Sequence, residues 1–79
     1  MNWHDHIESD PAVLGGKVRV RGTRIGVAFL LDLFGAGWTQ AQVLESYPHL
    51  TADDLRAVFA FASETADDVR AVPPRRPAA

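Results

Sequence analysis

Residues 15–24, with the sequence GGKVRVRGTR, organise the fold of this 79-residue chain. Val18 and Val20 alternate with Lys17, Arg19 and Arg21, so the two valines lie on one face of a strand and the three cations on the other. Glycines on both sides of the run indicate turns that need a positive φ. We therefore expect a strand over residues 17–21 with one apolar and one basic face.

A second short strand is predicted before this one. Apolar and polar side chains alternate from Trp3 to Glu8, which places Trp3 and Ile7 on the buried side. Pro11 follows an aspartate and marks a turn. The two strands pair either within one chain or between subunits. A ribbon of two strands is marginal in water, so it has to pack against helices or a second ribbon.

Helical spacing governs the rest of the chain. Val27, Leu30, Leu31 and Phe34 form one apolar stripe, and glycines at 35 and 37 end the helix that carries it. A second, short helix is predicted to begin at Thr39, where Gln42 stands at the position that completes a capping box.

A third helix is predicted to begin at the cap Thr51. Leu55, Val58, Phe59 and Ala62 supply its core stripe, and apolar residues at 66, 69 and 72 extend it.

Together these elements predict a mostly α fold with a short N-terminal β-ribbon and a three-helix, helix-turn-helix (homeodomain-like) core. The chain forms a single domain over residues 1–72, divided into the ribbon (1–26) and the helical core (27–72), followed by a flexible tail (73–79). No hairpin pattern follows the third helix, which disfavours a winged helix.

Composition excludes several classes of protein. The chain has no cysteine, which excludes disulfides and thiolate metal sites. The acidic N-terminus does not resemble a signal peptide, and the longest apolar run, residues 27–31, is too short to span a bilayer. We therefore expect a cytoplasmic protein with no membrane contact. A chain this small buries little surface, so we also expect a homodimer with a shared core.

Charge is divided unevenly along the chain. Residues 1–26 carry four cations against three carboxylates, and residues 27–72 carry two cations against seven carboxylates, giving net charges of +1 and −5. A basic edge on an acidic body suits two unlike partners.

Several short motifs resemble one bacterial and archaeal family, the domain of unknown function numbered four hundred and thirty-three. They are Asp10-Pro11, Gly15-Gly16-Lys17, Arg21-Gly22-Thr23-Arg24-Ile25, Gly37-Trp38-Thr39, Tyr47-Pro48-His49-Leu50-Thr51 and Asp54-Leu55. The resemblance implies a small helix-turn-helix-like protein, and many relatives resemble antitoxins encoded beside a PIN-like ribonuclease toxin. The chain departs from the pattern at Gln42, where the family usually has Glu, and beyond Ala62.

The basic strand is the first candidate for DNA binding. Its cations, with Arg24 after the turn, either contact phosphates or protect an edge strand against aggregation. Three or four phosphate contacts give a slope of roughly −3 to −4 for log K against log salt. Alternatively, Arg24 forms an ion pair with an acidic residue of the first or third helix instead of contacting a ligand. The residues predicted to contact DNA are Lys17, Arg19, Arg21, Thr23, Arg24, Thr39, Gln40 and Gln42.

The other candidate residues are predicted to have structural roles or to be solvent-exposed. Carboxylates in the first turn of the third helix repel phosphates, so this helix is predicted to be structural. Thr23 is most simply a turn residue whose hydroxyl bonds nearby backbone. His4 and His6 are interpreted as solvated side chains, since two histidines fall short of a zinc site. We expect no metal, no cofactor and no catalysis.

The leading hypothesis is a dimeric antitoxin that neutralises a PIN-like toxin and binds its own operator through the ribbon. The residues predicted to bind the toxin are Phe61, Glu64, Asp67, Asp68 and Val69. The alternatives are a stand-alone DNA-binding regulator and a dimeric interaction module that binds no DNA.

Overall fold

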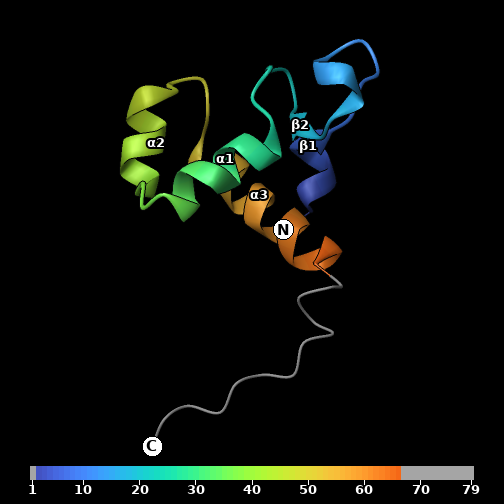
Figure 1. The fold of residues 1–79 in the computed structure, drawn as a ribbon. Coiled ribbons are helices and arrows are strands. Elements are labelled where there is room, and N and C mark those ends of the chain that lie inside the picture. Colours follow the sequence, from blue (N-terminus) through green and yellow to red (C-terminus); the bar gives the residue numbers. More distant parts are fainter. Residues whose placement is uncertain (1, 67–79) are drawn as a thin grey trace, which may run out of the picture.

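The structure is a computed structural model and describes residues 2–66. This part of the chain has three helices and a two-stranded antiparallel sheet, and is mostly α as predicted (Figure 1). In chain order the elements are η1 (Trp3–Asp5), β1 (Ile7–Glu8), η2 (Leu14–Gly16), β2 (Arg19–Val20), α1 (Val27–Gly35), α2 (Gln40–Ser46) and α3 (Ala52–Thr65), where η denotes a 3-10 helix.

The two strands pair within the chain, with Ile7 opposite Val20 and Glu8 opposite Arg19. Both strands are shorter than predicted, because the strand expected over residues 17–21 contains two residues and the one expected from Trp3 begins only at Ile7. Trp3 lies instead in η1, where the Asn2 side chain accepts a hydrogen bond from the His4 amide at 3.0 Å. The expected alternation is therefore confirmed only around the paired residues.

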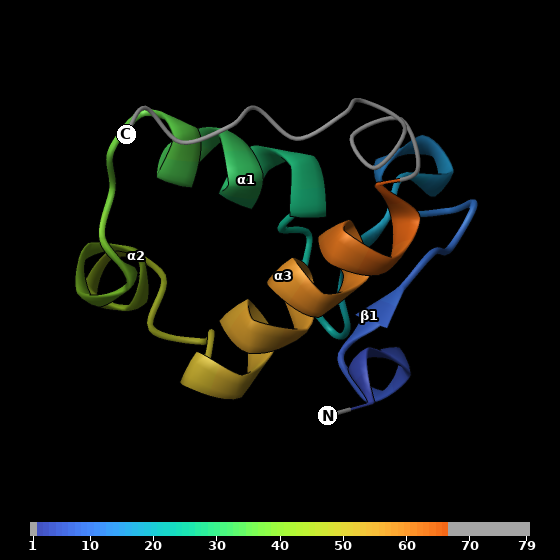
Figure 2. The ribbon, with the colours of Figure 1, turned by 90° about the horizontal axis from the view of Figure 1, so that it is seen from below.

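Helix α3 is the element around which the others pack. It contacts η1, β1, α1 and α2, and Figure 2 shows α1 along one side of it and β1 with the N-terminal turn along the other. The buried core draws on both strands, all three helices and the turn before α3. Its members are Ile7, Val20, Val27, Leu30, Val43, Leu50, Leu55, Ala57 and Val58.

The predicted capping box at Thr39 and the predicted cap at Thr51 are both confirmed, and Thr51 also proves to be part of a capping box. Thr39 accepts a hydrogen bond from the Gln42 amide at 3.1 Å, and the Gln42 side chain accepts one from the Thr39 amide at 2.8 Å. Thr51 and Asp54 make the same reciprocal pair at the start of α3. These bonds satisfy amides that a helix start leaves without intrahelical partners.

Helix α3 departs from prediction in its core face and at its end. Leu55 and Val58 are buried, but Phe59 is 39% exposed and packs against Phe34, while Ala57 takes its place in the core. Other elements cover α3 from more than one side. Its buried face therefore includes Ala57, which lies off the predicted stripe. The helix ends at Thr65, so the predicted continuation through residue 66 is wrong, and residues 67–79 lie outside the described part.

Candidate functional site

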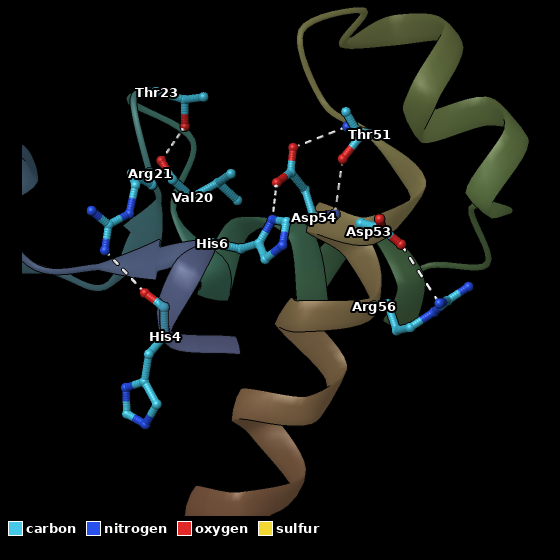
Figure 3. Close-up of polar contacts among 9 residues, drawn as sticks. All are labelled: His4, His6, Val20, Arg21, Thr23, Thr51, Asp53, Asp54 and Arg56. Carbon is cyan, nitrogen blue, oxygen red and sulfur yellow. Dashed lines mark hydrogen bonds and ion pairs between the residues drawn. The ribbon is translucent and has the colours of Figure 1, made fainter. Parts of the chain in front are cut away.

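The basic segment, residues 17–24, closes in a tight turn at Gly22. The φ of Gly22 is 78°, which a glycine adopts without strain. Thr23 stabilises this turn, because its hydroxyl donates to the Val20 carbonyl at 2.8 Å (Figure 3). The same hydroxyl accepts a hydrogen bond from the Ile25 amide at 3.0 Å. The predicted role of Thr23 as a turn residue is confirmed. The turn sends the chain directly into α1.

Arg19 does not share the exposed basic face that alternation predicts. Its side chain is 11% exposed, and its Nη2 lies 3.0 Å from Glu8 Oε1. The same guanidinium donates to the Thr23 carbonyl, and Glu8 also accepts from the Gly22 amide at 3.3 Å. Strand pairing places Glu8 directly opposite Arg19, and opposite charges at such positions attract. Arg19 is therefore a structural cation of the ribbon.

Three cations of the segment remain exposed. Arg21 donates from Nη2 to the His4 carbonyl at 3.0 Å, which ties the turn to η1 (Figure 3). The side chains of Lys17 and Arg24 have no hydrogen-bond or ion-pair partner among residues 2–66. The alternative in which Arg24 pairs with an acidic residue of α1 or α3 is thus not what the described residues show.

An apolar groove of about 860 Å³ adjoins these cations. Its wall is formed by the loop through Leu14, the turn before α1 and the outer side of α1, and most of its lining is apolar. Phe29 is 44% exposed at this groove and meets the Tyr47 ring edge to face at 5.8 Å between centroids. Lys17, Arg24 and Asp32 bring charge to the lining.

This groove was not predicted from the sequence, although one signal for it was present. Phe29 lies off the apolar stripe that begins at Val27, so a helix must present it away from the core. Leu14 also lines the groove, but the sequence around it contains no comparable sign of an exposed position. Leu14 adopts a φ of 53°, uncommon for a residue other than glycine, and lies 36% exposed.

A separate polar network joins the ribbon to the start of α3 (Figure 3). His6 Nδ1 lies 2.8 Å from Asp54 Oδ1, and Asp54 Oδ2 accepts the Thr51 amide at 3.0 Å. The interpretation of both histidines as solvated is therefore wrong for His6. Nowhere in residues 2–66 do three His, Cys, Asp or Glu side chains gather in a group that could hold a metal ion.

The predicted DNA contacts of α2 lie apart from the ribbon. Thr39 and Gln42 are occupied by the capping box, and Gln40 is exposed. Figures 1 and 2 both show α2 and the β1–β2 ribbon at opposite ends of the molecule. The structure therefore does not bring the two predicted sets into one surface within a single chain.

The predicted toxin contacts are divided between described and undescribed residues. Phe61 is half-buried against Trp3, whose ring meets it edge to face at 5.0 Å. Glu64 is exposed and accepts a hydrogen bond from the Trp3 indole nitrogen. Asp67, Asp68 and Val69 lie outside the described residues.

Within residues 2–66, every helix is too short or too polar to cross a membrane.

A family model and a crystal structure point to the same family. The family model described as "Protein of unknown function (DUF433)" matches residues 7–62. The uncharacterized protein y4eO of Sinorhizobium fredii is 36% identical over 56 residues, which are 71% of this chain and 25% of that protein. The crystal structure of a DUF433 member from Anabaena variabilis superimposes with a TM-score of 0.74 at 34% identity, over 81% of this chain and 63% of that one. The chain thus spans a quarter of the length of y4eO and under two thirds of the crystallised relative, and it belongs to the DUF433 family.

Proposed function

We propose that this chain is a homodimeric antitoxin that binds a PIN-like ribonuclease toxin and its own operator DNA. The observation that carries this proposal is the division of its surface. Exposed cations gather at the ribbon turn and the helical body carries a net charge of −5, so one molecule offers separate surfaces to an anionic and a cationic partner. The family resemblance to antitoxins supports the same function.

For DNA binding, the proposal assigns phosphate contacts to Lys17, Arg21 and Arg24. Arg19 is left out because Glu8 and the Thr23 carbonyl already occupy its guanidinium. The contacts predicted for Thr39, Gln40 and Gln42 are left out as well, because α2 lies at the opposite end of the molecule from the ribbon and the capping box occupies Thr39 and Gln42. The short connection between α2 and α3 supports a helix-turn-helix arrangement.

Helix α3 is assigned a structural role in this proposal. Its first turn carries Asp53 and Asp54, and Arg56 stands 3.5 Å from Asp53. Carboxylates at the tip of a helix that enters the major groove face the phosphates of the backbone and repel them. The recognition surface therefore has to lie elsewhere.

We assign toxin binding to the acidic residues between positions 64 and 68, which are Glu64, Asp67 and Asp68. Phe61 and Val69 are the apolar contacts. The test is co-expression with the ribonuclease encoded by a neighbouring reading frame. We expect the full chain to restore growth and to co-purify with the toxin, whereas a chain that ends after Ala66 does neither.

The matched control for this truncation is Arg75→Ala/Arg76→Ala in the full chain, which keeps every acidic residue and should neutralise as well as the wild type. A truncated chain that still holds the toxin would remove the acidic segment from the proposal. A full chain without effect on growth would contradict the antitoxin function itself.

A second function, an interaction module that binds no DNA, is favoured by the internal pairing of Arg19 and the anionic start of α3. It differs from the antitoxin in one outcome, since it predicts no salt-dependent binding of duplex DNA.

A further inference from the structure

The apolar groove beside α1 borders both assigned surfaces, because Lys17, Arg24 and Phe61 are in its lining, but its exposed apolar side chains Phe29 and Leu14 are used by neither. Apolar side chains that stand exposed around a hollow in a small domain mark a contact with another molecule. Phe29 is 44% exposed there, and Leu14, at 36%, lies at the same groove. A molecule that binds in this groove therefore has to present an apolar surface.

The charges at the groove restrict what this occupant is. Arg24 and Asp32 both line it, and neither side chain has a hydrogen-bond or ion-pair partner among residues 2–66. Phe29 and Asp32 are three residues apart on α1, which places them on neighbouring parts of one helix face. With Lys17, which also lines the groove, one surface thus carries an aromatic side chain, a hollow, two cations and a carboxylate.

We propose that the groove is the homodimer interface, and that its occupant is a second copy of this chain. Phe29 of each copy enters the groove of the other, and Asp32 of each copy pairs with Arg24 of the other. A two-fold interface uses the same patch on both subunits, so every contact between unlike residues occurs twice. The inference rests on the homodimer of the proposed function and specifies its surface.

A patch that carries both signs favours this occupant over the toxin. A surface for one acidic or one basic partner carries mainly one sign of charge at its rim, whereas a patch with both signs can be complementary to itself about a two-fold axis. In this arrangement Arg24 is used between subunits, which leaves Lys17 and Arg21 as the cations for phosphates.

The test is a charge-swap experiment read by analytical ultracentrifugation of the full chain. Asp32→Arg places two arginines opposite each other at both contacts, and Arg24→Asp places two aspartates there. Each variant alone should dissociate about tenfold or more readily than the wild type, because like charges face each other across the interface. Mixing the two variants restores an opposite pair at both contacts, so the mixture should sediment as a heterodimer.

A pair of phenylalanine variants checks the position of the interface. Phe29→Ser should weaken the dimer about tenfold or more, since a buried aromatic side chain is a typical hot spot. Phe59→Ser, an equally exposed phenylalanine on α3 outside the groove, should leave the dimer constant unchanged. Circular dichroism establishes that each variant is folded.

Three results would overturn the inference. They are a monomeric wild type, a wild-type dimer that both charge variants retain, and a loss of toxin binding by Asp32→Arg with the dimer intact. In the second and third results the proposed antitoxin stands and only its dimer surface is wrong. Absence of toxin neutralisation beside a restored heterodimer would instead remove the antitoxin function and leave this interface in place.

Discussion

Leu55→Ala is expected to lower the free energy of unfolding by about 3 kcal/mol. Leu55 is fully buried in α3, the helix that contacts α1, α2 and the N-terminal elements, so the cavity lies where they meet. In a domain of this size such a loss corresponds to a fall of roughly 12–24 °C in melting temperature. Urea denaturation followed by circular dichroism measures the effect.

The matched control is Phe59→Ala on the same helix. Sequence periodicity places Phe59 on the core stripe with Leu55, whereas the structure leaves it 39% exposed. We expect a smaller cost of about 1–2 kcal/mol, because only the contact with Phe34 and part of the ring's burial are lost. A Phe59 variant as unstable as the Leu55 variant would contradict the orientation of α3.

Arg19→Ala is expected to cost about 2 kcal/mol of stability. The change leaves Glu8 without its partner on the ribbon and removes a donor from the Thr23 carbonyl. Breaking a fully buried pair costs more, but the Glu8 side chain keeps 28% exposure and water screens part of the loss.

Arg24→Ala serves as the control for the intrinsic stability of the fold, because its side chain has no polar partner among residues 2–66. A double-mutant cycle with Glu8→Ala isolates the Glu8–Arg19 coupling. Equal stability of the Arg19 and Arg24 variants, measured below the concentration at which the chain associates, would contradict a structural role for Arg19.

The helical half of the fold follows from local sequence. Thr39 with Gln42, and Thr51 with Asp54, are reciprocal caps whose partners are three residues apart, so the sequence alone specifies them. The stripe of α1 is also local, and it correctly places Val27 and Leu30 in the core. Such features need no knowledge of what packs against the helix.

The N-terminal half depends on residues far apart in the chain. Trp3 lies against Phe61, and His6 bonds Asp54, so neither environment was visible in the alternating pattern that predicted a strand. The direction of Arg19 depends on register, because only the pairing with Glu8 brings a carboxylate opposite it. Alternation assigned Arg19 to one face of the strand but did not identify Glu8 as its partner.

The candidate site was predictable in its parts and not in its arrangement. The turn at Thr23 was predicted and is confirmed, and the off-stripe position of Phe29 indicated an exposed aromatic residue. Their meeting in one groove with Leu14 depends on how the loop before β2 returns to the start of α1. Periodicity within one element does not contain that information.

The most direct test of the proposed antitoxin measures how its DNA binding depends on salt. Fluorescence anisotropy follows a labelled duplex from the chain's own upstream region, titrated at several salt concentrations with wild type and Lys17→Ala/Arg21→Ala. We expect tight binding by the wild type, and a slope of log K against log salt that becomes shallower by roughly 2 per chain in the double variant. Arg56→Ala, on α3, should keep the wild-type slope. Equal slopes for wild type and the double variant, or binding no tighter than to a scrambled duplex, would contradict recognition of DNA by the ribbon.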